Sequence, residues 1–205
     1  MSEPHKSLPQ SVIRRLTKYL THVQVLQTQG VEWVSSQELA TNLGLTSSTV
    51  RQDLSHVDFS GISRRGYEIG GLCAVLSKVL GADTVWNMIV VGGGNLGRAL
   101  ALHEEFFRRG FNICAIFDND EKKVGKKIGR FTVQHTRSLP SLIRTSKIDV
   151  AVIAVPASAA QGVTDILIAS RVRGILNMAQ THIVTPHRVP VVDVRIVASL
   201  QELAH

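Results

Sequence analysis

The first third of the chain has the hydrophobic spacing of helices. Between residues 12 and 26 apolar side chains recur at steps of three and four, which places them on one helix face. Gly30 predicts the end of this helix. The face comprises Val12, Ile13, Leu16, Tyr19, Leu20, Val23 and Leu26. This helix is followed by a short strand at 33–34 and two shorter helices. A linking helix at 72–80 then ends at Gly81.

From residue 81 onward, apolar runs typical of buried strands alternate with helical patterns. Strands are predicted near 87–91, 112–117, 131–134, 149–155, 173–177 and 191–194, and helices at 95–109, 138–146 and 159–170. This alternation predicts an α/β domain with a parallel sheet. A last amphipathic helix at 196–203 has no obvious place on that sheet, and we expect it to cap its own domain or to pack on a partner subunit.

The two short helices after residue 34 have the pattern of a helix-turn-helix. Ser35 and Glu38 form a capping box for the first, and Gly44 closes it. The second opens with Thr46 and small hydroxyl residues, as recognition helices that enter the major groove often do. Its candidate DNA-facing residues are Ser47, Ser48, Arg51 and Gln52. The alternative is a small helical subdomain whose second helix is merely solvated.

A basic hairpin follows directly. Arg64 and Arg65 lie beside Gly66 at its predicted tip, flanked by Ile62 and Ile69. In a winged helix such a hairpin is the wing, whose arginines contact phosphate or the minor groove. A helix-turn-helix with a basic wing favours DNA binding more than either feature alone.

A glycine turn joins the first strand of the α/β domain to a helix. Gly92, Gly94 and Gly97 fit G-x-G-x-x-G, and Asp118 lies about 20 residues beyond, as the dinucleotide-binding fingerprint requires. The helix N-terminus would face the pyrophosphate. An ordinary glycine turn is the alternative, and the strand, helix and acid around the motif favour a dinucleotide.

Residues at the carboxyl ends of later strands are second-rank candidates, because ligands bind at that edge of an open sheet. They are Val155, Pro156, Asn177 and Ala179. From pattern alone they are equally well explained as ordinary connections.

The positive net charge of the chain suggests a negatively charged partner. The formal net charge of the 205 residues is +7. Residues 1–80 carry eight Lys and Arg against six Asp and Glu, whereas residues 81–205 carry fifteen against ten. Net charge therefore does not single out the N-terminal part as the DNA binder.

The chain predicts a cytoplasmic protein with no membrane association. No apolar run approaches the ~18 residues of a membrane span, and the first six residues have no signal core. Cys73 and Cys114, far apart in apolar patterns, are expected to be buried thiols in a reducing compartment, and a disulfide is the alternative.

An enzyme is the first hypothesis for a dinucleotide domain, but little supports it here. No length remains for a catalytic domain, the histidines are isolated, and no carboxylate pair, metal-ligand cluster or nucleophile motif is present. A ligand-sensing transcription factor explains both halves. The alternatives are an oxidoreductase with an N-terminal dimerisation domain, and a regulator that senses another nucleotide.

The segments 34–40, 50–55, 91–100, 117–125, 154–156 and 174–177, in this order, resemble the Rex family of redox-sensing transcriptional repressors. The resemblance extends from residue 16 to about 203. It implies a winged helix-turn-helix domain at 1–80, a Rossmann domain with a doubly wound parallel sheet at 81–194, and a helix at 195–205 exchanged within a homodimer. Such repressors bind a palindromic operator in double-stranded DNA and release it when NADH replaces NAD⁺.

The resemblance also assigns roles. Gly92, Gly94, Asn95, Leu96 and Gly97 would hold the pyrophosphate of NAD(H), and Asp118 the adenosine ribose, which favours NAD(H) over NADP(H). The nicotinamide would lie near Val155, Pro156 and Asn177. Arg51 matches the recognition-helix arginine of the family, and Gly66 and Tyr67 match the end of its wing.

Several positions depart from the family. Gln52 replaces a lysine, the basic residues of the wing are displaced, and Met178, Ala179 and Gln180 replace Phe-Ala-Pro. Thr21, His103 and Arg195 stand where NADH-sensing members have an arginine, a tyrosine and an aspartate that couple the domains. We therefore expect dimerisation and dinucleotide binding with an altered or weakened response to NADH, and the pair His103 and Arg195 could add sensitivity to pH or anions.

Overall fold

The computed structural model describes residues 8–186 and 188–204, so the first residues and their predicted lack of a signal core lie outside this range. The chain forms two compact units, Met1–Thr84 and Val85–His205. None of the described helices is long and apolar enough to cross a bilayer.

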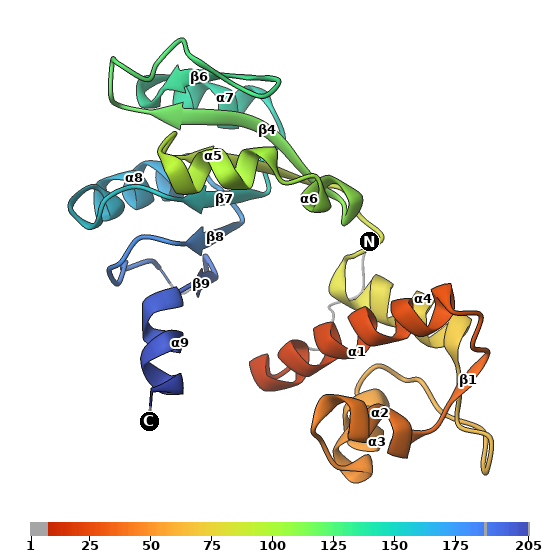
Figure 1. Ribbon diagram of the computed structural model, residues 1–205. Helices are drawn as coiled ribbons and strands as arrows, with labels where there is room; N and C mark the ends of the chain where they lie inside the picture. The colour runs from red at the N-terminus through yellow and green to blue at the C-terminus, as the bar shows by residue number, and fades with distance from the viewer. Residues whose placement is uncertain (1–7, 187, 205) are drawn as a thin grey trace. The chain divides into compact units, whose positions relative to one another are not determined.

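The first unit is a small helical domain with a two-stranded sheet. Its elements are α1 (Gln10–Thr28), β1 (Trp33–Val34), α2 (Ser36–Leu43), α3 (Ser47–Ser55), β2 (Tyr67–Glu68) and α4 (Ile69–Leu80). Strands β1 and β2 pair antiparallel, and α1 packs along α4 (Figure 1). The predicted apolar face of α1 is largely buried, with Leu16 and Tyr19 fully so. The capping box is present, and Gly44 ends α2 in the left-handed conformation.

The second unit is built on a seven-stranded sheet with the order β5-β6-β4-β3-β7-β8-β9. All neighbouring strands are parallel except β5 and β6. The six parallel strands have the Rossmann order, which confirms the predicted doubly wound sheet. The strands are β3 (Trp86–Val91), β4 (Phe111–Asp118), β5 (Lys127–Ile128), β6 (Phe131–His135), β7 (Val150–Ile153), β8 (Gly174–Asn177) and β9 (Val191–Asp193).

Helices cover both faces of this sheet (Figure 1). One core contains residues of α7 (Leu139–Thr145) and α8 (Ala157–Ala169). The opposite core is joined by residues of α5 (Asn95–Leu102) and α6 (Glu105–Arg108). A 3₁₀ turn (Thr136–Ser138) precedes α7, and α9 (Ile196–Leu203) follows the last strand.

Two features differ from the predictions, and one strand was missed. The helix expected at 95–109 is broken because His103 has extended backbone, and the break allows Phe106 to pack against the sheet core. The short antiparallel strand β5 left no periodic signal in the sequence.

Cys114 is exposed rather than buried, and Cys73 is only partly buried; both are free thiols. Cys114 lies at an irregularity where Met88 pairs with Ile113 but Ile89 with Ala115, so it has no partner in β3.

Candidate dinucleotide and DNA sites

The glycine loop after β3 adopts a backbone that side chains would block. Gly92 has φ +114°, and a Cβ there would lie 2.2 Å from the carbonyl oxygen of Ala154. A Cβ on Gly97 would lie 1.8 Å from the oxygen of Gly92, so this glycine lets α5 approach the strand. At Gly94 a Cβ would meet nothing within 4 Å. The first and third glycines shape the loop, and the second leaves space above it.

Asp118 ends β4 beside this loop and is buried. Its Oδ2 accepts hydrogen bonds from the Gly93 N–H at 2.8 Å and from Lys123 Nζ at 3.0 Å, and its Oδ1 accepts one from the Asp120 N–H at 2.9 Å. Burial alone would raise the pKa of Asp118, but these donors outweigh it and hold the pKa below its ordinary value. The residue is therefore a pre-oriented carboxylate.

A cavity of about 770 Å³ lies over the carboxyl ends of β3, β4 and β7. This is the point where the strand order reverses, at which open α/β sheets bind their ligands. Seven of the ten predicted cofactor residues line it: Gly92, Gly94, Asn95, Leu96, Asp118, Val155 and Pro156. Lys123 and Thr136 also line it. Neither was a predicted site residue, although each closely follows a strand whose carboxyl end lies at this edge.

The other three predicted residues do not line this cavity. Gly97 packs beneath the loop, as described above. Asn177 is buried, and its amide donates to the Thr181 oxygen at 2.9 Å and to Asp193 Oδ1 at 2.7 Å. Its own oxygen accepts from the N–H of buried Ala179 at 3.1 Å. Asn177 and Ala179 therefore organise the turn after β8.

The predicted recognition helix is α3. The hydroxyl of Thr46 caps its N-terminus by accepting from the Thr49 N–H at 3.1 Å. Ser48, Arg51 and Gln52 are exposed, and Ser47 is partly buried. Arg51 donates to Ser36 Oγ of α2 at 3.2 Å, which orients the guanidinium between the two helices. The exposed face of α3 is thus polar and carries one oriented cation.

The opposite face of α3 is tied to α1 through Asp53. This buried carboxylate accepts two hydrogen bonds from Arg15, at 2.6 and 2.7 Å, and one from the Tyr19 hydroxyl at 2.7 Å. Burial tends to raise the pKa of Asp53, but the bonds from Arg15 and Tyr19 lower it overall. Burial and the same carboxylate raise the pKa of Tyr19. No motif in the sequence indicated this cluster.

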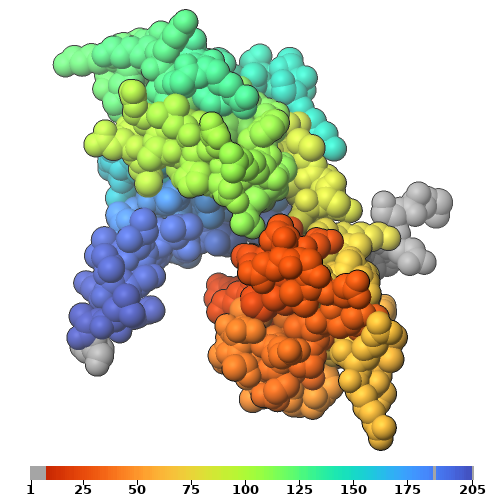
Figure 2. Space-filling view, turned by 45° about the vertical axis from the view of Figure 1, so that its right-hand side comes forward, coloured from red at the N-terminus to blue at the C-terminus, as the bar shows by residue number. Residues whose placement is uncertain are grey.

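The predicted wing, residues 61–66, is a tight hairpin. The Ile62 N–H donates to the Gly66 oxygen at 2.7 Å, and the reverse bond is 2.9 Å long. The wing projects as a finger from the N-terminal unit (Figure 2), with Arg64 and Arg65 exposed. Tyr67 is different from the other predicted DNA residues, because its position in β2 turns it into the core beside Phe59. Its side chain supports the wing and is absent from the exposed surface.

Comparison with known proteins shows that both units occur together in one protein family. Residues 7–55 match a family model described as "Putative DNA-binding protein N-terminus", and residues 83–181 match one described as "CoA binding domain". The redox-sensing transcriptional repressor Rex of Carboxydothermus hydrogenoformans is 39% identical, over 96% of this chain and 94% of that protein. Rex of Thermosipho africanus is also 39% identical, over 97% and 95%. This chain belongs to the Rex family.

Solved structures of a Rex-family repressor have the same fold as this chain. The crystal structure of RSP in complex with β-NAD⁺ and operator DNA has a TM-score of 0.93 at 32% identity, and covers 97% of this chain and 92% of that one. The RSP complex with β-NADH has a TM-score of 0.88 at 33% identity over 96% and 92%. The Rex relatives are named repressors, so the oxidoreductase alternative finds no support among them.

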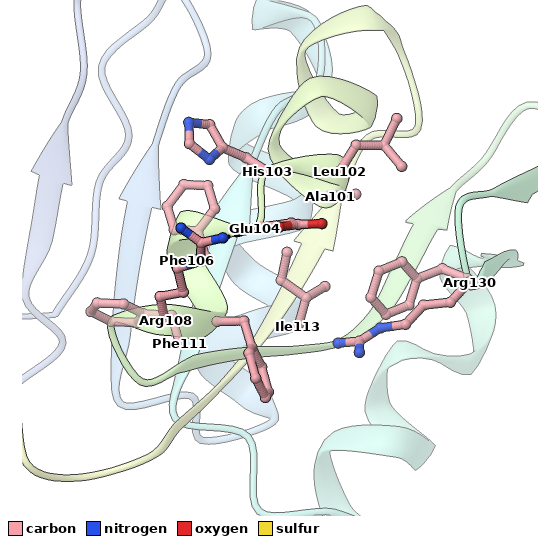
Figure 3. A pocket seen from close by; sticks show the side chains of 11 residues that line it. Ala101, Leu102, His103, Glu104, Phe106, Arg108, Phe111, Ile113 and Arg130 are labelled. Atoms are coloured by element: carbon pink, nitrogen blue, oxygen red, sulfur yellow. Dashed lines mark hydrogen bonds and ion pairs between the residues drawn. The ribbon is translucent and has the colours of Figure 1, made fainter.

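Thr21, His103 and Arg195, the three positions predicted to differ from the switch residues of the family, have local partners. Arg195 pairs with Asp193 at 3.6 Å. The Thr21 hydroxyl donates to the Thr17 oxygen at 3.1 Å within α1. His103 accepts from the Glu105 N–H at 3.3 Å, and its ring lies edge-on to Phe106 with centroids 5.6 Å apart. His103 also borders a second cavity, of about 380 Å³, where α5 breaks (Figure 3).

Proposed function

We propose that this Rex protein is a homodimeric transcriptional repressor that binds NAD(H) in the glycine-loop cavity and a palindromic operator through α3 and the wing. It is not an enzyme, and the binding of operator DNA supports a cytoplasmic location. The observation that carries the proposal is the combination, in one chain, of a Rossmann cavity with an open glycine position and a DNA-binding helix with an oriented arginine.

The cavity fits a dinucleotide in three respects. The space left by Gly94 permits a pyrophosphate to approach the backbone, and the N-terminus of α5 supplies its positive dipole end and N–H groups that have no partner within the helix. Asp118 is ionised and lies at the end of the neighbouring strand, where it would accept a ribose hydroxyl. Its negative charge disfavours a 2′-phosphate, although Lys123 at 3.0 Å partly offsets that charge.

The N-terminal unit fits a DNA groove. Arg51 and Gln52 lie next to each other on the exposed face of α3, and a guanidinium suits guanine whereas a primary amide suits adenine. Ser48 at the start of the same helix would contact phosphate. Two copies related by a dyad would read two half-sites, which explains why the operator should be palindromic.

We also propose that NADH acts on this repressor through a different or weaker coupling than in NADH-sensing relatives. Threonine at position 21 has no charge to offer an ion pair, and Arg195 already pairs with Asp193 of the same chain. Two of the three switch positions therefore lack the chemistry of an interdomain arginine–aspartate pair.

One titration tests both proposals. The full chain is added to a labelled duplex carrying a family-type palindromic operator at fixed salt, and fluorescence anisotropy follows release by NADH, NAD⁺ or NADPH. Operator binding is expected, with NADH and NAD⁺ differing little in their effect. Absence of operator binding at any salt would contradict the repressor proposal. Selective release by low NADH would contradict a weakened coupling and would show instead that the response uses a different coupling route.

A further inference from the structure

We propose that the two adjacent arginines of the wing have different roles: Arg64 contacts DNA, and Arg65 is a positioning residue that holds the wing against Trp33. This inference rests on the proposed operator binding. It concerns two side chains that the sequence alone could not distinguish, since both are exposed arginines at the tip of one hairpin.

The base of the wing is fixed to the strand before the helix-turn-helix. Val34 of β1 pairs with Tyr67 of β2. Gly66, with φ +92°, is pressed so closely on β1 that a Cβ there would lie 2.3 Å from the Val34 oxygen. The wing therefore leaves the domain at a defined place, and its remaining freedom is the angle of the finger.

Arg65 restricts that angle. Its guanidinium carbon lies 4.0 Å from the centre of the Trp33 ring, and Trp33 is the first residue of β1. A planar guanidinium stacked on indole combines dispersion with attraction to the ring face, and arginine forms this contact better than lysine. The stack joins the hairpin loop to a strand whose position is set by the core, so the wing is ordered before DNA arrives.

Arg64 has the opposite character. It occupies the turn in the left-handed conformation, with φ +65°, which glycine adopts far more readily than arginine. Within the described part of the chain its side chain makes no hydrogen bond or ion pair. The hairpin itself projects from the N-terminal unit (Figure 2). An exposed cation in its turn, with no hydrogen-bond or ion-pair partner among the described residues, is suited to contact a phosphate or a minor-groove edge.

The two roles predict different salt dependence. The salt slope, taken here as the magnitude of the slope of log K against log salt, falls by about 0.9 for each lost phosphate contact, so Arg64→Ala in both wings of a dimer should lower it by nearly two units. At 0.15 M salt this corresponds to roughly ten- to thirty-fold weaker binding. Arg65→Ala should leave the slope unchanged and weaken binding only about two- to five-fold per subunit, the value of one exposed cation–π contact.

The experiment is an anisotropy titration of the full chain with a labelled family-type operator at several salt concentrations. The variants are Arg64→Ala, Arg65→Ala, Trp33→Leu and the double variant Arg65→Ala/Trp33→Leu. The double variant should bind no more weakly than either single one, because both remove the same stack. Arg64→Lys is the matched control and should keep the wild-type slope. Circular dichroism and thermal midpoints verify that each variant is folded.

A second readout follows the wing without DNA. In a Trp86→Phe background, the fluorescence of Trp33 should change on Arg65→Ala and stay constant on Arg64→Ala. The inference is overturned if Arg65→Ala lowers the salt slope as Arg64→Ala does, or if Arg64→Ala leaves it unchanged. Failure of the wild-type chain to bind operator would instead overturn the proposed function, and this inference with it.

Discussion

At the scale of single residues, Asp53 shows how buried contacts position the proposed DNA-binding face of α3. It follows Arg51 and Gln52 on α3 and points inward, where Arg15 and Tyr19 of α1 hold it with three hydrogen bonds. Because a buried carboxylate without donors is strongly unfavourable, this cluster fixes α3 on α1 and so sets where the exposed side chains lie.

Asp53→Asn should lower the free energy of unfolding by about 2–3 kcal/mol, because an amide cannot replace the charged partner of Arg15. Operator affinity should fall as α3 loses its anchor, while NADH binding to the other unit is unchanged. Urea denaturation, anisotropy and calorimetric titration with NADH measure the three effects. Glu32→Gln, at an exposed acid of the same unit, is the control. An equal loss in both variants would refute the assignment.

Low pH should reduce the stability of the folded protein through the carboxylate of Asp53. The pKa values of Asp53 and Asp118 are both below that of an unfolded aspartate, about 3.9. Their ionised forms therefore contribute stability that is complete above that pH and is lost as pH falls through their folded values. Unfolding midpoints in urea should drop below about pH 4, and Asp53→Asn should flatten this dependence. If the stability of the variant depended on pH in parallel with that of the wild type, Asp53 would not be the group responsible.

At the scale of elements, the glycines in the loop between β3 and α5 have two different roles. One is needed for packing, and another leaves space for the proposed ligand. Gly97 permits the contact of helix and strand, and Gly94 faces open space. Two substitutions that look alike in the sequence motif should therefore behave differently.

Gly94→Ala should fold with an unchanged melting temperature, because its Cβ meets nothing within 4 Å, yet weaken NADH binding by obstructing the pyrophosphate. Gly97→Ala should destabilise the second unit, because its Cβ would lie 1.8 Å from a carbonyl oxygen. Differential scanning calorimetry and NADH titration separate the two effects. Equal melting temperatures for both variants would show that the loop can rearrange.

At the scale of the whole molecule, α9 is the clearest sign that the chain acts with a second copy. Ile196, Val197, Leu200 and Leu203 are 55%, 54%, 60% and 83% exposed. A helix with this much exposed apolar surface is unfavourable in water unless another surface covers it. We propose that the partner subunit of the homodimer covers this face of α9.

Leu200→Glu should convert the dimer to monomer in sedimentation velocity at micromolar concentration, because it places a charge on the face to be covered. Operator affinity should fall with it, since each half-site is then bound alone. Gln201→Glu adds the same charge to the same helix and should leave the dimer intact. If both variants remain dimeric, α9 is not the contact.

The sequence by itself determined most of the helices and strands and most of the residues that line the cavity. Apolar periodicity distinguishes helix from strand because each places its buried side chains at a different repeat, and this predicted α1 and the six parallel strands. The glycine motif and Asp118 predicted a dinucleotide site where the structure has a cavity, because only particular residues permit that turn and an approach of backbone to phosphate.

Tertiary structure decided which side chains face the solvent and which neighbours they have. Tyr67 was expected at the DNA surface and lies in the core, while Cys114 was expected in the core and is exposed. The Asp53 cluster and the stack of Arg65 on Trp33 join residues 38 and 32 positions apart, and no local pattern records such contacts. They form only when elements pack, because their energy depends on burial and on distances that the order of residues does not specify.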